Sequence, residues 1–218
     1  MLNKDKVLGV ILAGGQARRM GGADKPLTEI SGKPLLAYVV ERLRPQLPHL
    51  LLNANGDTKR YAQFNLPVQE DIVPDFAGPL AGVLSAMAYA RAFQPQVTHV
   101  ITVAADTPFY PSEYIDRMLS SVDEANTLAC ASYKGRTQPV FGLWPVDLHN
   151  ELHRALVEED IHKVDLFTAR YGVADVNFDE MSFNPFFNVN RIEDVAEGEA
   201  LLAAHVAYEA LAVTHHDK

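Results

Sequence analysis

The stretch Val10–Leu27, VILAGGQARRMGGADKPL, decides the fold prediction. Residues Val7–Ala13 are apolar and rich in β-branched side chains, which is typical of a strand buried on both faces of a parallel sheet. This run ends at Gly14 and Gly15, and a loop with two arginines, further glycines and Lys25 follows. Glycine lets backbone N–H groups approach an anion closely, and the cations add positive charge. The stretch therefore predicts a buried strand that leads into a loop suited to a di- or triphosphate.

The loop matches neither of the two common phosphate-loop motifs. The pattern GxxxxGK[ST] needs Ser or Thr after its lysine, whereas Pro26 follows Lys25, and GxGxxG is absent as well. The alternative is an exposed surface loop in which Arg18 and Arg19 face water. The buried strand that leads into the loop favours anion binding.

Apolar runs and helical patterns alternate along the rest of the chain. This alternation predicts right-handed β–α–β crossovers and a three-layer α/β fold, with a mostly parallel, Rossmann-like sheet and helices on both faces. The expected strands are residues 7–13, 49–54, 66–70, 97–104, 127–132, 140–144 and 173–177. The expected helices are residues 35–44, 79–93, 111–122, 146–159, 162–171 and 191–205. We expect a single domain over residues 1–206 and a C-terminal tail over residues 207–218.

The composition excludes several classes of protein. A net charge of −9 over 218 residues argues against a general nucleic-acid or anionic-membrane binder, which needs a basic surface. The single cysteine, Cys130, forms no internal disulfide and favours a reducing compartment; without a neighbouring His or Cys, it reads as a small buried strand residue. The apolar run at residues 7–13 is too short for a signal peptide, and no stretch approaches the ~20 apolar residues of a membrane helix. We therefore expect a cytoplasmic protein.

Polar or glycine-rich clusters follow four of the predicted strands. In parallel sheets, ligands bind beyond the carboxyl ends of the strands. The clusters are the loop after residue 13, Asn53–Gly56, Glu70 to Pro79, and Asp106–Pro108. Each could be an ordinary turn by itself, but together they predict one site at this edge of the sheet.

Asp106 is a candidate metal ligand. It follows the apolar run Val100–Ala105, so its carboxylate needs either a cation or a place at the mouth of the sheet. Mg²⁺ is a hard cation that is held in proteins by one or two carboxylates together with substrate phosphates. The alternative is a turn or N-cap aspartate before Pro108. Asp71 has similar alternatives: a ribose or base contact, a second metal contact, or a turn residue.

Two further features are candidates for nucleotide contacts. Gly78 and Pro79 begin a predicted helix whose free N–H groups would face the same edge, although they could simply start the helix. Gly82 would permit close approach of a base or a phosphate. The amides of Asn53 and Asn55 can both donate and accept, which suits a purine edge or a ribose, but asparagine is also common in turns.

A late segment, Phe186–Asn190, reads FFNVN. Alternation places Asn188 and Asn190 on one face of an extended strand, where two amides could hold an acceptor molecule. The alternative is a pair of edge-strand amides that face water.

These motifs together resemble the molybdenum cofactor guanylyltransferases, which belong to a larger nucleotidyltransferase superfamily with a Rossmann-like sheet. The resemblance runs from about Val7 to His205. It rests on LAGGQARRMGGADKPL, NAN, Asp71, GPLAG, Asp106-Thr-Pro and FFNVN, in that order. It implies transfer of GMP from GTP to the phosphate of molybdenum-bound molybdopterin, which yields the molybdopterin guanine dinucleotide cofactor and pyrophosphate.

The resemblance also implies a role for individual residues. The implied catalytic residues are Arg19, Lys25 and Asp106, with Asp106 as the Mg²⁺ ligand. The implied GTP-binding residues are Leu12, Ala13, Gly14, Gly15, Lys25, Asn53, Asp71, Gly78, Pro79 and Asp106. The implied acceptor-binding residues are Arg19, Gly22, Lys163, Asn188 and Asn190. The resemblance further implies transient contacts with molybdenum-insertion and recipient molybdoenzyme proteins, and we expect a monomer.

The chain departs from the family pattern at three positions. Pro26 stands where glycine is usual, Gln138 precedes Pro139 where histidine is usual, and Lys163 stands where arginine is usual. Two groups of alternatives stay open. One is a cytidylyl- or sugar-phosphate nucleotidyltransferase, although cytidylyl relatives usually carry LAAG where this chain has LAGG. The other is a non-catalytic chaperone that binds a nucleotide or a pterin.

Overall fold

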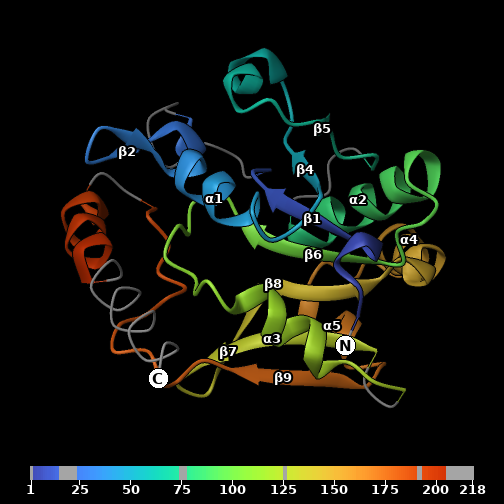
Figure 1. Cartoon of the computed structure of the whole chain (residues 1–218). Coiled ribbons are helices and arrows are strands. Elements are labelled where there is room, and N and C mark those ends of the chain that lie inside the picture. The colour runs from blue at the N-terminus through green and yellow to red at the C-terminus, as the bar shows by residue number, and fades with distance from the viewer. Residues whose placement is uncertain (1, 15–23, 74–77, 125–126, 191–192, 205–218) are drawn as a thin grey trace.

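A central mixed sheet organises the molecule (Figure 1). The computed structural model describes residues 2–14, 24–73, 78–124, 127–190 and 193–204. Within these ranges the sheet has seven strands in the order β5-β4-β1-β6-β8-β7-β9. β8 is antiparallel to both of its neighbours, and the other pairs are parallel. The strands are β1 (Val7–Leu12), β4 (His49–Asn53), β5 (Val68–Gln69), β6 (His99–Ala104), β7 (Leu128–Tyr133), β8 (Arg136–Pro145) and β9 (Val173–Asn177).

Helices cover both faces of the sheet, as the alternation predicts (Figure 1). One face packs against α1 (Leu35–Leu43) and α3 (Tyr114–Ser121), and the other against α2 (Pro79–Phe93), α4 (His149–Val157) and α5 (Val164–Thr168). A small hairpin of β2 (Glu29–Ile30) and β3 (Lys33–Pro34) precedes α1. The helix of residues 194–204 lies beside that hairpin, where Ser31 N donates to Glu199 Oε1 at 3.1 Å. The three-layer α/β fold is therefore confirmed.

β1 explains why the sheet sits between two apolar layers. Its side chains alternate between the two cores: Val7 and Ile11 belong to the α1/α3 core, and Leu8 and Val10 belong to the α2/α4/α5 core. All four side chains are fully buried. A strand that is apolar on both faces needs a helix layer on each side, which is what the sequence of β1 predicts.

Several predicted boundaries are wrong. The helix expected over residues 111–122 begins at Tyr114, because Pro111 lies in the preceding turn and its carbonyl accepts from Tyr114 N. The helix expected over residues 146–159 is a 3₁₀ turn followed by α4, and the one expected over residues 162–171 shortens to α5. The strand expected over residues 140–144 extends to β8, whose pairing with β7 shifts at a bulge.

Cys130 lies in β7, as expected of a strand residue, but it is only half-buried, so the expectation of a buried residue is wrong in that respect. Burial raises the pKa of Cys130 to about 11, whereas an unfolded chain deprotonates at about 8.5. A raised pKa stabilises the fold at pH values below the unfolded pKa, and that contribution is lost as the pH rises through about 11.

We therefore expect the free energy of unfolding to fall by about 3 kcal/mol more in the wild type than in Cys130→Ala as the pH rises through this window. Urea unfolding of both proteins across the window measures the difference. Parallel stability curves would contradict the assignment of this pH dependence to Cys130.

Candidate functional site

The carboxyl ends of β1, β4 and β6 meet at one edge of the sheet. Leu12 pairs with Asn53 of β4 on one side and with Ala104 of β6 on the other. Beyond the strands, Ala13 N donates to the Asn53 carbonyl at 2.9 Å, and Ala105 N donates to the Leu12 carbonyl at 3.0 Å. The strand-end rule thus correctly places three of the predicted polar clusters together.

The first group at this edge is an amide–carboxylate cluster of Asn53, Asn55 and Asp71. Asn53 Nδ2 donates to Asp71 Oδ1 at 2.9 Å, and Asn55 Nδ2 donates to Asp71 Oδ2 at 2.7 Å. Asp71 N donates back to Asn55 Oδ1 at 2.8 Å. Both oxygens of the Asp71 carboxylate are therefore held in place by amides, although each oxygen can accept a further hydrogen bond.

The first turns of α2 pack directly on this cluster. A Cβ atom on Gly82 would lie 2.4 Å from Asn53 Oδ1 and 2.7 Å from Leu12 Cδ2, so this close approach requires glycine. A Cβ atom on Gly14 would lie 3.3 Å from the same Asn53 oxygen. Ser85, which the sequence did not indicate as a site residue, adds a further hydrogen bond. Its buried hydroxyl accepts from Ile72 N at 3.0 Å.

Gly78 and Pro79 begin α2 as predicted. Gly78 is the N-cap with φ at 150°, and Pro79 is the first helical residue. A Cβ atom on Gly78 would lie 3.7 Å from the His162 carbonyl oxygen. This contact places the chain just before Lys163, which is exposed and caps α5, next to the beginning of α2.

The second group is the Asp106 cluster, formed by Lys25, Asp106, Thr107, Asn188 and Asn190. The Lys25 ammonium donates to Asp106 Oδ2 and to Asn190 Oδ1. The Thr107 hydroxyl lies 3.2 Å from Asp106 Oδ1 and also contacts Asn188 Oδ1. Segments that are far apart in the sequence therefore converge on one carboxylate.

The segment of residues 186–190 is not a strand, so that prediction is wrong. A single backbone bond, from Val189 N to the Asp106 carbonyl at 3.0 Å, holds it against the end of β6. The alternation is nevertheless correct: Val189 is buried, whereas Asn188 and Asn190 on either side of it are exposed. Both amides reach the Asp106 cluster.

Pro26 has a local explanation. It lies in the 3₁₀ turn Lys25–Leu27 and is buried. The bonds of this turn run from Leu27 N to the Asp24 carbonyl at 2.9 Å and from Thr28 N to the Lys25 carbonyl at 3.1 Å. No bond of the turn uses an N–H at position 26, so proline costs the turn nothing and fixes its φ angle.

Of the other two departures from the family pattern, Lys163 lies at the beginning of α5 and Gln138 lies in β8. Gln138 is in β8 and pairs with Ala131 of β7. Its side-chain Nε2 donates to the Arg136 carbonyl at 3.3 Å, so this departure falls in the β7–β8 hairpin. The remaining predicted site residues, Gly15, Arg19 and Gly22, lie outside the residues that the structure describes.

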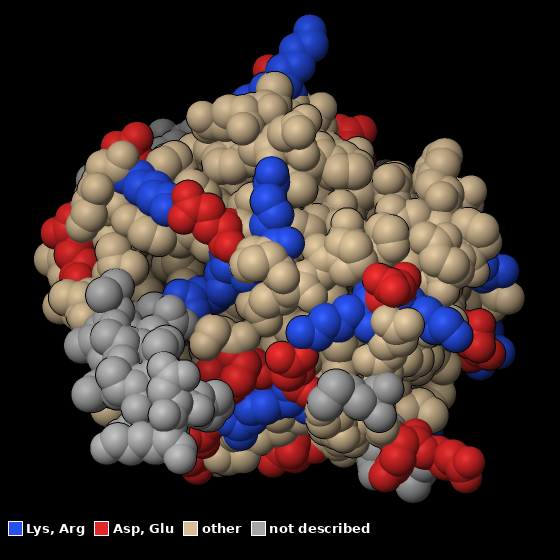
Figure 2. Space-filling view, in the orientation of Figure 1, with Lys and Arg blue, Asp and Glu red and all other residues tan. Residues whose placement is uncertain are grey.

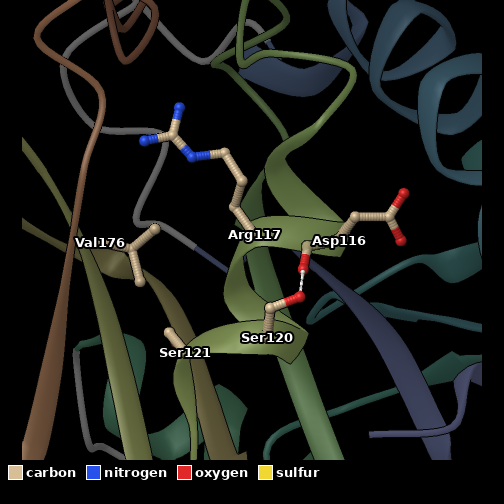
Figure 3. A pocket seen from close by; sticks show the side chains of 5 residues that line it. All are labelled: Asp116, Arg117, Ser120, Ser121 and Val176. Carbon is tan, nitrogen blue, oxygen red and sulfur yellow. Dashed lines mark hydrogen bonds between the residues drawn. The ribbon is translucent and has the colours of Figure 1, made fainter. Parts of the chain in front are cut away.

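Two hollows lie elsewhere on the described surface, one of about 440 Å³ lined in part by Glu41, Arg42 and Ser112. On the face that Figure 2 shows, outside its grey residues, basic and acidic side chains lie side by side and form no broad basic area. A hollow of about 370 Å³ lies between α3 and β9. Figure 3 shows its Arg117 guanidinium pointing away from Ser120, whose hydroxyl donates to the Asp116 carbonyl at 2.7 Å. The two charged residues that line it, Asp116 and Arg117, form ion pairs with Lys4 and Glu180. Within the described helices, none has the length and apolar character needed to cross a bilayer.

The chain matches the model of the MobA-like NTP transferase domain over residues 9–170. It is 50% identical to the molybdenum cofactor guanylyltransferase of Bradyrhizobium sp. (strain ORS 278) over 198 residues, which is 90% of this chain and 93% of that protein. It is also 50% identical to that of Rhodopseudomonas palustris (strain BisB5) over 193 residues, covering 88% of this chain and 92% of the relative.

Solved structures show the same fold at low sequence identity. The molybdopterin-guanine dinucleotide biosynthesis protein A of Archaeoglobus fulgidus matches with a TM-score of 0.71 at 21% identity, over 90% of this chain and 98% of that one. The 4-diphosphocytidyl-2C-methyl-D-erythritol synthase of Anaerococcus prevotii matches with a TM-score of 0.70 at 14% identity, over 93% and 100%. These structures support the fold alone. The family model and the sequence relatives, which cover most of the chain, establish that it belongs to the molybdenum cofactor guanylyltransferase family of MobA-like NTP transferases.

Proposed function

We propose that the protein transfers GMP from GTP to the phosphate of molybdenum-bound molybdopterin, forming the guanine dinucleotide cofactor and pyrophosphate. The observation that carries this proposal is the Lys25–Asp106 pair beside two exposed amides, at the sheet edge that also holds the amide–carboxylate cluster. The close relatives named for this activity support the choice of substrates.

The amide–carboxylate cluster is proposed to bind the guanosine part of GTP. Guanine presents two kinds of N–H donor and one carbonyl acceptor, and the cluster offers carboxylate acceptors and amide groups of both kinds. The missing Cβ of Gly14 leaves room beside Asn53 and Asp71. The residues proposed for GTP are Leu12, Ala13, Gly14, Gly15, Lys25, Asn53, Asp71, Gly78, Pro79 and Asp106.

Asp106 is proposed to hold Mg²⁺. In the structure one of its oxygens already holds a cation, the ammonium of Lys25. The described residues contain no group of three His, Cys, Asp or Glu side chains able to hold a metal ion. A single carboxylate such as Asp106 suits Mg²⁺, which proteins hold with one or two carboxylates plus substrate phosphates. Asp106 would hold Mg²⁺, which would neutralise charge on the phosphate oxygens, and Lys25 beside it would contact the nucleotide.

The reaction follows from these positions. An oxygen of the acceptor phosphate attacks the α-phosphorus of GTP, and the bond from that phosphorus to the bridging oxygen breaks, so that pyrophosphate leaves. No protein base is needed, because a phosphate monoester is largely a dianion near neutral pH. Lys25 and Arg19 are proposed to stabilise the charge on the phosphate oxygens, so that catalysis is positioning together with electrostatic stabilisation.

The acceptor is proposed to bind on the side of the exposed amides of Asn188 and Asn190, with Arg19, Gly22 and Lys163. We further propose that the protein acts in the cytoplasm as a monomer, with one domain over residues 1–206 and a tail over residues 207–218. Transient contacts with molybdenum-insertion and recipient molybdoenzyme proteins belong to the same proposal.

Gly82→Ala is expected to raise the KM for GTP about tenfold with a smaller effect on kcat. The added methyl group would lie 2.4 Å from Asn53 Oδ1, so the Asn53 amide must move and its bond to Asp71 must weaken. Steady-state kinetics measure the change, and Ala92→Ser at an exposed position of the same helix is the control. A KM equal to that of the wild type would show that Asn53 does not position the nucleotide.

Thermal unfolding with each nucleoside triphosphate and Mg²⁺ tests the choice of nucleotide. A ligand that binds only the folded state raises the Tm, and we expect GTP to give the largest rise. A larger rise with CTP would favour the cytidylyl alternative, and no rise with any triphosphate would contradict the proposal.

A further inference from the structure

We infer that Asp24, Arg60 and Tyr61 form a positioning brace that holds Lys25 at a fixed distance from the amide–carboxylate cluster. None of these three residues was among the predicted site residues. The inference rests on the proposed function, because it concerns how the phosphate and guanosine parts of one GTP molecule are held together. It assigns the three residues no contact with the reacting atoms.

Asp24 is held at both oxygens of its carboxylate. The Tyr61 hydroxyl donates to Asp24 Oδ1 at 3.0 Å, and Arg60 Nε lies 2.6 Å from Asp24 Oδ2 in an ion pair. Burial raises the pKa of Tyr61 to about 12, so its hydroxyl keeps its proton and remains a donor at neutral pH. Since Asp24 directly precedes Lys25 and caps its 3₁₀ turn, fixing the Asp24 side chain fixes the start of the Lys25 turn.

The same arginine reaches the other group of the site. Arg60 Nη2 donates to the Asn55 carbonyl at 3.0 Å, and the Asn55 side chain exchanges two hydrogen bonds with Asp71. An unbroken series of contacts therefore runs from the Lys25 turn through Arg60 to Asp71. Both ends of this series are proposed to bind parts of one nucleotide.

The charges give the brace a second effect. A free Asp24 carboxylate beside Lys25 would repel a triphosphate and would compete with Asp106 for the Lys25 ammonium. In the structure each charge has a different partner: Asp24 pairs with Arg60, and Lys25 pairs with Asp106. Arg60 therefore leaves Lys25 available on the side of the site where the phosphates are proposed to bind.

The position of Arg60 argues against a purely structural role. Its side chain is 37% exposed and lies on the 3₁₀ segment Thr58–Phe64 between β4 and β5, outside the apolar cores. Exposed ion pairs contribute little to stability. Tyr61 is buried in the core, where its ring stabilises the fold by packing. Tyr61→Phe keeps the ring and removes only the hydroxyl.

The test uses Arg60→Met and Tyr61→Phe, with Lys59→Met as a matched control that removes a neighbouring exposed cation. We expect the KM for GTP to rise about tenfold in Arg60→Met and about threefold in Tyr61→Phe, with the KM for the acceptor unchanged. The rise in Tm caused by GTP, measured without acceptor, should shrink in the same order. Lys59→Met should behave as the wild type in both measurements.

Thermal unfolding without nucleotide separates positioning from structure. Variants that lose thermal stability but keep the KM for GTP and the GTP-induced rise in Tm would overturn the brace and leave the proposed function intact. If the wild type itself gives no pyrophosphate from GTP and no rise in Tm with GTP, both the proposed function and the brace are overturned. If Arg60→Met does not fold, Tyr61→Phe alone decides the matter.

Discussion

Asp106→Ala is expected to lower kcat by about 10²-fold or more, which is the usual effect of removing a major electrostatic group from an active site. Asp106 lies where β6 ends and contacts Lys25 and Thr107, so its carboxylate is at the centre of the second cluster. Its loss would remove the proposed metal ligand and the group that orients Lys25. Steady-state release of pyrophosphate, at saturating GTP and acceptor, measures kcat directly.

The matched control for this prediction is Asp116→Ala. Asp116 is an exposed carboxylate in α3 that pairs with Lys4, outside both clusters. We expect its removal to leave kcat within about twofold of the wild type. Turnover of Asp106→Ala close to that of the wild type would refute the assignment of the metal to Asp106.

Lys25→Met is expected to lower kcat/KM for GTP by about 10²- to 10³-fold. The Lys25 ammonium lies inside the Asp106 cluster, where it contacts Asp106 and Asn190. The proposed reaction places it against the phosphate oxygens. Methionine keeps most of the side-chain volume and removes only the charge. Initial rates at low GTP concentrations give kcat/KM without saturation.

Lys33→Met is the control for Lys25→Met, because Lys33 pairs with Glu41 at the surface near α1. Its kcat/KM should stay within about twofold of the wild type. Since Lys25 and Asp106 are in direct contact, the double variant should lose less activity than the product of the two single losses. A Lys25→Met enzyme with unchanged kcat/KM would show that this lysine binds no part of GTP.

The sequence predicted the sheet edge well, because its signals are local. An apolar run followed by glycine or a carboxylate marks the end of a buried strand, and parallel strands bring such ends together. This reasoning places Asn53 and Asp106 at the ends of their strands, beside the loop that follows the first strand. The register of β1 against β4 and β6 then confirms that the three lie at one edge.

The brace could not be predicted in the same way. Arg60 and Tyr61 lie in a 3₁₀ segment between β4 and β5, away from any predicted strand end. Their contacts with Asp24 span more than 30 positions in the sequence, and neither periodicity nor turn chemistry encodes such a pairing. The only local signal of the brace is Asp24 beside Lys25. Without its partners Arg60 and Tyr61, Asp24 indicates an ordinary helix N-cap.

The asparagine segment shows a different limit. The alternation at residues 186–190 correctly predicts which side chains are exposed. A strand, however, also needs a neighbouring strand whose backbone groups are free to form hydrogen bonds with it. In the described part of the chain the segment makes one backbone bond to this edge, from Val189 N to the Asp106 carbonyl just beyond β6. A two-residue periodicity therefore established the face of Asn188 and Asn190 but not their secondary structure.

The central claim is the transfer of GMP to the phosphate of molybdenum-bound molybdopterin. The most direct measurement incubates the purified protein with GTP, Mg²⁺ and the molybdopterin cofactor, and identifies the pterin product by mass spectrometry. We predict a product heavier by one GMP unit, formed together with an equal amount of pyrophosphate and absent in Asp106→Ala. A pterin of unchanged mass after incubation with GTP, or one that gains only CMP when CTP is supplied instead, would contradict the claim.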